Sequence, residues 1–308
     1  MDLYTSIRNA TVGGCILGLS TSAYLALKSS DALHIIYVGG LFLGGAGVRM
    51  LIPSALENDY IWLDLTGGYG SLMLIAGGVL TGMGTTIGHG CTSGHGLCGL
   101  ARLSKRSLLG VVSFFSTGLL TATVLHPFFH KNWVPTRTQP SLVPVHDTLP
   151  VSVILGAFLT LYGFTQTEIS RGLAASFCSI LFAFGLGISG MLQPTKIHGF
   201  LALTTGWDPS LAFVMAGGLL TNLVLWPVIT KWTQPITCPM FDLPKKTELE
   251  GDLVVGGVLF GIGWAVGGLC PGPGMVGIAG PYGSSALIWT AACVLGQQLV
   301  VSFWKKSK

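Results

Sequence analysis

The chain has 308 residues; half of them are hydrophobic, only 9% are charged, and the formal net charge is +4. Soluble domains carry roughly 25% charged residues, so this composition excludes an ordinary soluble domain and predicts an integral membrane protein. Its mean hydropathy of +0.68 agrees. The basic residues are few and scattered, which excludes nucleic acid as a partner and leaves the lipid bilayer as the expected surroundings.

Nine apolar segments are long enough to cross a bilayer as helices, for which about 17–25 residues suffice. They lie near 10–27, 33–52, 67–88, 107–129, 150–166, 173–192, 210–230, 251–270 and 284–304. We therefore predict an all-α integral membrane protein with about nine transmembrane helices, some of them broken or re-entrant at glycines. Because the first segment continues as a full span, we expect no cleaved signal peptide.

Two polar spacers interrupt this pattern. Residues 131–149 contain three prolines and divide the chain into a first membrane repeat (1–130) and a second one (150–308). Residues 231–250 form a second, charged loop. With nine crossings and the N-terminus outside, eleven of the sixteen Lys and Arg residues face the cytoplasm. The positive-inside rule therefore predicts a multi-pass protein of the cell membrane (plasma or inner membrane) with a cytoplasmic C-terminus.

Residues 88–99, with the sequence GHGCTSGHGLCG, interrupt the apolar pattern most sharply. They combine five glycines with two cysteines and two histidines. Non-helical backbone at membrane depth is tolerated only where it is buried in protein or lines a cavity. This stretch therefore predicts a site inside the bilayer. The seven cysteines lie mostly in apolar sequence, so we interpret them as thiols and not as disulfides.

An internal repeat pairs this stretch with the second half. Residues 77–91 align without gaps to 256–270, and eight of the fifteen positions are identical. Residues 44–54 align more weakly to 185–195. The offset grows from 141 to 179 residues, which we attribute to an additional helix near 210–230. This extra crossing would invert the second copy, and inverted repeats place their sites at the interface between copies.

Cys91 and Cys270 occupy equivalent repeat positions. Each ends a glycine-rich helix, and glycine and proline after it predict a turn before a new helix. Helix ends between such breaks offer N–H groups to an anion, and Thr92 and Ser93 add hydroxyl donors. The alternative is that these cysteines pack as small hydrophobic residues.

Three further residues of the stretch have two interpretations each. His89 and His95 either line the site or satisfy nearby backbone carbonyls. Cys98 is either a second thiol of the pathway or a packing residue. The spacing of these histidines and cysteines suggests a metal, but the repeat keeps only the one cysteine, so we expect no metal and no other cofactor.

The segment 189–196 breaks the predicted sixth helix and contributes two candidates. Met191 is assigned to the pathway. Lys196 is either a snorkelling residue at the interface or a charge at the outer entrance. Asp208 and Pro209 have the form of a helix start. The basic segment 102–107 is interpreted as a cytoplasmic anchor.

Two enzyme classes lack their sequence signatures here. There is no phosphate-binding loop for an ATPase and no serine–histidine–acid arrangement for hydrolysis. We therefore assign no catalytic residue and expect a transporter and not an enzyme.

Residues 88–107 closely resemble the signature of the YeeE/YedE family of sulfur-compound transporters. Residues 185–218 and 261–274 resemble the companion half, a separate chain in many bacteria, so both halves are fused here. The resemblance implies an hourglass-shaped, pseudo-symmetric helical bundle that imports thiosulfate, with Cys91 and Cys270 as relay thiols. The family's cysteine in an arginine-containing N-terminal motif has only Cys15 as a counterpart, which leaves other sulfur or selenium species as alternative substrates.

Two other functions remain open at this point. In a membrane sulfurtransferase, Cys91 would take sulfane sulfur as a persulfide and pass it to a cytoplasmic sulfur-accepting protein. In a structural or redox-sensing protein, uptake would not depend on any cysteine.

Overall fold

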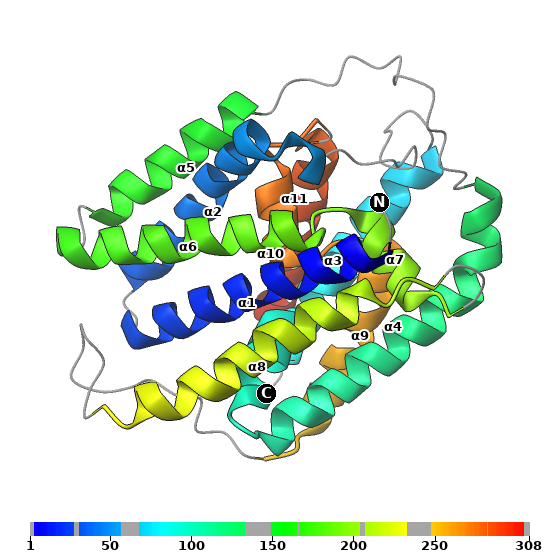
Figure 1. The fold of residues 1–308 in the computed structure, drawn as a ribbon. Coiled ribbons are helices and arrows are strands. Elements are labelled where there is room, and N and C mark those ends of the chain that lie inside the picture. Colours follow the sequence, from blue (N-terminus) through cyan, green and yellow to red (C-terminus); the bar gives the residue numbers. More distant parts are fainter. Residues whose placement is uncertain are drawn as a thin grey trace.

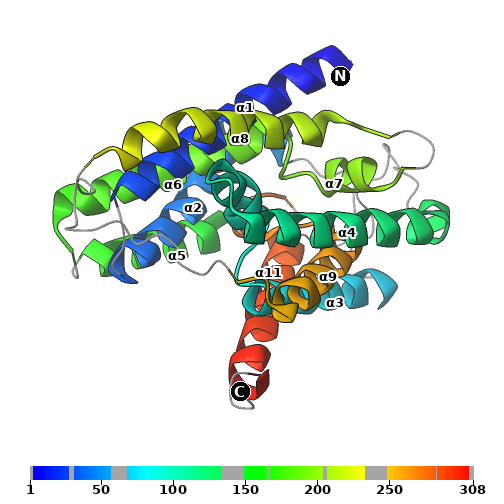
Figure 2. The same ribbon diagram turned by 90° about the horizontal axis from the view of Figure 1, so that it is seen from below.

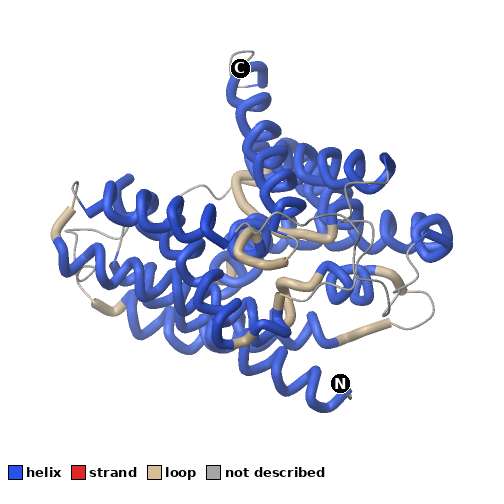
Figure 3. The backbone as a smooth tube through the Cα atoms, turned by 90° about the horizontal axis from the view of Figure 1, so that it is seen from above, coloured by secondary structure: helices blue, strands red, loops and turns tan. Residues whose placement is uncertain are grey.

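The computed structural model describes residues 3–27, 31–56, 68–132, 149–164, 167–203, 207–232, 248–281 and 283–304. Within these ranges the secondary structure is helical and contains no strand (Figure 3). Most of the predicted connector 131–149 (residues 133–148) and most of the charged loop 231–250 (residues 233–247) lie outside the described residues, as does Cys238. Residues 131 and 132 belong to α4 and residue 149 to α5.

The long helices coincide with the nine predicted apolar segments (Figure 1). They are α1 (Leu3–Leu27), α2 (Asp31–Leu51), α3 (Gly68–Ile87), α4 (Lys105–Asn132), α5 (Leu149–Phe164), α6 (Ile169–Ser189), α8 (Ser210–Thr230), α9 (Gly251–Gly267) and α11 (Gly283–Leu299). Between them lie short elements, namely the 3₁₀ turn η1 (Pro53–Ala55), the π-helical segment η3 (Thr92–Gly99), α7 (Pro194–Leu201) and α10 (Pro271–Gly277). A π-helical turn, η4 (Val300–Trp304), follows α11.

In the described part of the chain, six helices are long and apolar enough to cross a membrane, and a seventh span is formed if α3 and η3 count together. These two elements meet at a 44° bend. The prediction of an all-α integral membrane protein is therefore confirmed, whereas nine crossings are not. α5 is one helix outside this set, because its 16 residues fall short of the usual span.

Helix packing follows the internal repeat. α1 packs on α6 in the way that α5 packs on α2, and α4 packs on α9 in the way that α11 packs on α3. Each short element, η3 and α10, contacts the long helix that follows it. Equivalent helices of the two repeats therefore make equivalent contacts across the repeat boundary, as expected for two related units. α8 is additional, and it lies along α1 on the side opposite α6 (Figures 1 and 2).

Two pairs of equivalent helices differ in their relative direction. α3 and α9 are antiparallel, since Gly77 lies against Gly267 and Gly84 against Phe260. α2 and α6 are parallel, since Gly40 lies against Ser179 and Gly44 against Ala183. The inversion is therefore found between α3–η3–α4 and α9–α10–α11, which carry the two cysteine motifs. α8 reverses the chain before the second of these units, which explains why the two sequence offsets differ.

Candidate functional site

Two loops with the same backbone conformation carry the cysteines. In the first cysteine loop (residues 88–92), His89 has φ 56° and Cys91 is extended. In the second cysteine loop (residues 267–271), the equivalent residues are Gly268, with φ 61°, and extended Cys270. Each cysteine then precedes the first residue of a new short helix. The prediction that both cysteines mark helix breaks is confirmed.

Three glycines of 88–99 serve close approach and not a left-handed backbone, because the left-handed residue of the first loop is His89. A Cβ atom at Gly88 would meet Gly84 and Gly256, one at Gly90 would meet the His95 ring, and one at Gly99 would meet Ser107. Small residues let membrane helices approach this closely. They hold the first cysteine loop against α9 and η3 against α4.

A cavity of about 70 Å³ lies between the two cysteine loops. A single water needs roughly 10–15 Å³ measured in this way, so the cavity has room for a small anion. Cys91, Thr92, Ser93, Cys270 and Met191 line it. The remaining wall is mostly apolar and is contributed largely by α1, α6 and α8, including Leu17, Phe182, Leu186, Leu211, Val214 and Met215.

The two cysteine loops touch through a hydrogen bond. Thr92 Oγ1 donates to Cys270 Sγ at 3.7 Å, and Cys91 Sγ lies 3.2 Å from Ser93 Oγ. Cys270 is buried and Cys91 is half-buried. The structure thus brings Cys91, Thr92, Ser93 and Cys270 together although the two cysteine motifs lie far apart in the sequence.

His95 lies outside the cavity lining. Its Nε2 is 3.0 Å from the carbonyl oxygen of Gly88, and its Nδ1 is 3.2 Å from Ser107 Oγ. Both ring nitrogens are thereby used to fix η3 to its neighbours. The interpretation that His95 satisfies a backbone carbonyl therefore describes its contacts, and the interpretation that it lines the site does not.

His89 and Cys98 also lie outside the lining. His89 is exposed. Cys98 is half-buried and follows Leu97 in η3. The carbonyl oxygen of Leu97 accepts a hydrogen bond from Asn222 Nδ2 at 3.1 Å, and Asn222 Nδ2 also donates to Thr21 Oγ1. This polar cluster joins η3 to α1 and α8. The packing interpretation of Cys98 fits these surroundings.

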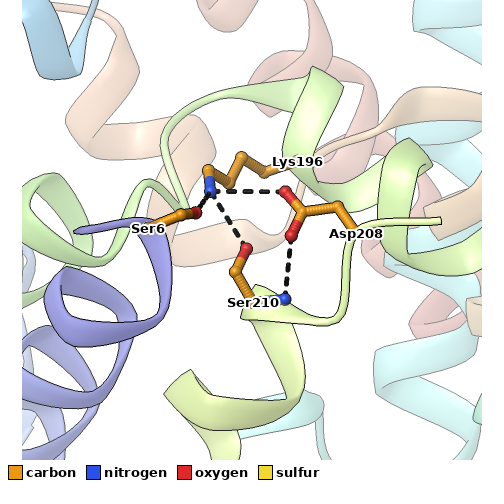
Figure 4. Close-up of polar contacts among 4 residues, drawn as sticks. All are labelled: Ser6, Lys196, Asp208 and Ser210. Carbon is orange, nitrogen blue, oxygen red and sulfur yellow. Dashed lines mark hydrogen bonds and ion pairs between the residues drawn. The ribbon is translucent and has the colours of Figure 1, made fainter. Parts of the chain in front are cut away.

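Lys196 joins three helices and does not reach the cavity. Its Nζ donates to Ser6 Oγ of α1, to Asp208 Oδ2 at 3.3 Å and to Ser210 Oγ at 3.0 Å (Figure 4). Asp208 Oδ1 also accepts the Ser210 N–H, as a residue at a helix start does. Burial alone would raise the pKa of Asp208, but these hydrogen bonds and the Lys196 charge hold it below its ordinary value.

The sequence analysis missed Trp264, which also lines the cavity. Its side chain is only 1% exposed and packs edge-to-face against Phe114 and Phe115 of α4. An apolar run with tryptophan is typical of any membrane helix, so the residue type alone gives no signal. The repeat gives one, because Trp264 is aligned with the polar residue Thr85.

The described cysteines, 15, 91, 98, 178, 270 and 293, are all free thiols. In the described part of the chain no three His, Cys, Asp or Glu side chains converge as metal ligands would. Two electrostatic contacts hold the basic segment after η3: Arg102 lies over the Trp226 ring at 5.6 Å, and Arg106 forms an ion pair with Glu250 at 3.9 Å.

Fold and site together define an all-α integral membrane protein with a small thiol-lined cavity between two broken helices. Residues 171–307 match a family of unknown function, DUF6691. A "probable transporter" of Xylella fastidiosa strain Temecula1 is 32% identical over 139 residues, which are 45% of this chain and 91% of that protein. Another "probable transporter", from strain 9a5c, is 34% identical over 118 residues, 38% of this chain and 80% of that protein. The chain belongs to the family of these proteins.

Proposed function

We propose that this protein is a membrane transporter that imports an inorganic sulfur anion, with thiosulfate as the first candidate. The observation that carries the proposal is the Thr92–Cys270 hydrogen bond, which joins the two cysteine loops beside a shared cavity. A site at the meeting point of two inverted broken helices is the usual place for a transported ion. The names of the Xylella relatives support transport in general.

We assign the chain to the YeeE/YedE family as a fusion of its two halves. The cysteine motifs carry this assignment. The matches to the Xylella relatives cover most of those proteins but less than half of this chain. A chain that joins two units of that size accounts for the difference.

The proposed mechanism starts from the cost of removing water from the anion, which is high unless protein groups replace the water. The Thr92 and Ser93 hydroxyls and the Cys91 and Cys270 thiols supply hydrogen-bond donors along the cavity. Thiols are weak donors, so no single position holds the ion too tightly, and weak successive sites permit passage. Neutral thiols are required, because a thiolate would repel the anion.

Membrane orientation and partners complete the proposal. The N-terminus lies outside and the C-terminus in the cytoplasm of the cell membrane, as the distribution of basic residues predicts. The imported sulfur anion is then available to a cytoplasmic sulfur-accepting protein.

The test is uptake of radiolabelled thiosulfate into proteoliposomes that contain wild-type protein, Cys91→Ala or Cys270→Ala. We expect each variant to lose at least tenfold in uptake at equal amounts of folded protein. Cys178→Ala is the matched control, because Cys178 is a buried thiol of α6 outside the cavity lining. Competition with sulfite, sulfide, sulfate and selenium analogues ranks the substrates. Uptake that is unchanged in both cavity variants would refute the relay.

A further inference from the structure

The ammonium group of Lys196 is held by oxygen atoms from three places in the chain. Its side chain is only 12% exposed, and lysine is rarely buried unless it is paired. An ammonium has three N–H donors, and three acceptors surround this one, namely Ser6 of α1, Asp208, and Ser210 of α8 (Figure 4). We call these four residues the ammonium cluster.

The ammonium cluster adjoins the cavity. A Cβ atom at Gly190 would lie 3.1 Å from Cδ and Cε of Lys196, so the lysine stem crosses this glycine. The next residue, Met191, lines the cavity, and so does Leu211, the residue after Ser210. The cluster therefore lies next to the cavity at the end where α8 begins, which is the outer end in the proposed orientation.

The charge of Lys196 supplies what the cavity itself lacks. None of the described residues that line the cavity is charged. An anion that leaves water for such surroundings needs a partner that offsets the loss of hydration. A lone ammonium would hold a doubly charged anion tightly, and tight binding prevents passage. The carboxylate of Asp208 limits this affinity, because an arriving anion has to take its place.

The three acceptors differ in their access to solvent. The side chain of Asp208 is 29% exposed, whereas Ser6 and Ser210 are 8% and 1% exposed. An anion that arrives from solvent therefore meets the carboxylate first. The backbone of Asp208 is held separately, since its N–H donates to the carbonyl oxygen of Gly199 at 2.9 Å. The carboxylate can thus leave Lys196 while the segment before α8 stays in place.

We infer that Lys196 is the first binding site of the transported anion and that the anion displaces Asp208 from it. This inference rests on the proposed function and deepens it, because it adds a charged site outside the thiol-lined cavity. An ammonium bonds any charged oxygen, so the site accepts small inorganic dianions in general, sulfate included. Discrimination among these anions then belongs to the cavity beyond it.

Opposite effects of two substitutions on thiosulfate uptake test the inference. Lys196→Gln removes the charge and is expected to raise the KM about tenfold. Asp208→Asn removes the competing charge and is expected to lower the KM about threefold, with a lower maximal rate because release into the cavity slows. A purely structural cluster would instead impair uptake in the same direction in both variants, and a KM that rises in both would overturn the inference.

A second ion pair provides the control for these kinetics. Arg171 pairs with Glu168 at 3.1 Å at the start of α6, at the opposite end of this helix from Gly190. Arg171→Gln also removes one paired cation and is expected to keep the KM of wild type. A KM that rises as much in Arg171→Gln as in Lys196→Gln would contradict a specific role for Lys196.

Anion binding to detergent-solubilised protein separates this inference from the proposed function. At constant ionic strength, thiosulfate and sulfate should each raise the melting temperature of wild type to a plateau. Lys196→Gln should need about tenfold more of either anion, and Asp208→Asn, which serves if Lys196→Gln does not fold, should need less than wild type. If wild type transports no thiosulfate but shows these shifts, the proposed function fails and the anion site stands. Equal anion requirements in wild type and the variants would overturn the site.

Discussion

Thr92 is the residue through which the first cysteine loop touches the second. Thr92→Val keeps the shape of the side chain and removes the hydroxyl that donates to Cys270 Sγ. A neutral hydrogen bond contributes about 0.5–1.5 kcal/mol, and sulfur is a weak acceptor, so thiosulfate uptake is expected to fall about threefold. Thr86→Val is the control, because the Thr86 hydroxyl bonds Gly82 within α3. An equal loss in both variants would assign the effect to α3 packing and not to the contact between loops.

Formation of a persulfide on Cys91 is the alternative to simple passage of the anion, and mass spectrometry of this residue distinguishes the two. If the protein only conducts the anion, mass spectrometry after thiosulfate exposure should find Cys91 as a plain thiol. A persulfide on Cys91, absent from Cys178 in the same sample, would indicate a sulfurtransferase instead.

The Lys196–Asp208 pair makes a prediction about pH. Because the folded state lowers the pKa of Asp208, the stability that this carboxylate contributes is present at neutral pH. It is lost as the pH falls through the folded-state pKa, below the ordinary value of about 3.9. Asp208→Asn should therefore lower the melting temperature of detergent-solubilised protein at pH 7, and the difference from wild type should shrink below about pH 4.

A matched change tests that assignment. Glu168 pairs with Arg171 at 3.1 Å, but its side chain is 69% exposed. Exposed pairs contribute little, so Glu168→Gln should melt within a degree or two of wild type at both pH values. A similar decrease in melting temperature for Asp208→Asn and Glu168→Gln at pH 7 would contradict a special stabilising role for the Lys196–Asp208 pair.

Among the elements, the second cysteine loop depends on a glycine. Gly268 has φ 61°, and a Cβ atom there would meet His198 Nε2 and Pro194. Gly268→Ala should destabilise the protein by about 1–3 kcal/mol in chemical unfolding. Gly94→Ala should be close to neutral, since nothing lies within 4 Å of that position. A neutral Gly268→Ala would show that the loop relaxes to another conformation.

The sequence predicted elements better than side-chain directions. Apolar length located the long helices, and the glycine and proline after each cysteine located both breaks. For His95 the sequence left two interpretations open, because the direction of its side chain depends on the π-helical turn of η3 and on Ser107 of the next helix, neither of which has a sequence signal. Trp264 was missed because tryptophan in an apolar run is typical of any membrane helix, and only its alignment with the polar residue Thr85 sets it apart in the sequence. The lining from α1 and α8 depends on tertiary packing that periodicity does not encode.

For the whole molecule, the number of crossings decides where the two termini lie. The packing directions agree with consecutive alternation. α1 is antiparallel to α6, since Gly13 lies against Ser189 and Leu17 against Gly185. α1 is parallel to α8, since Gly14 lies against Val214 and Gly18 against Gly218. With nine crossings, tags at the two termini should be accessible to protease from opposite sides of sealed vesicles. Tags accessible from the same side would require an even number of crossings.

The close contact between α3 and α9 has a consequence for how material crosses the membrane. Gly84 and Gly88 meet Phe260 and Gly256 backbone to backbone, with no side chain between them to rearrange. Packed contacts of this kind resist compression, so the two inverted units have little freedom to rock about each other. We expect permeation to be gated by rotation of side chains such as Thr92, and not by a rocking movement of the two units that is coupled to an energy source. Net flow would then follow the electrochemical gradient of the anion, and consumption of the anion in the receiving compartment would favour flow toward that side.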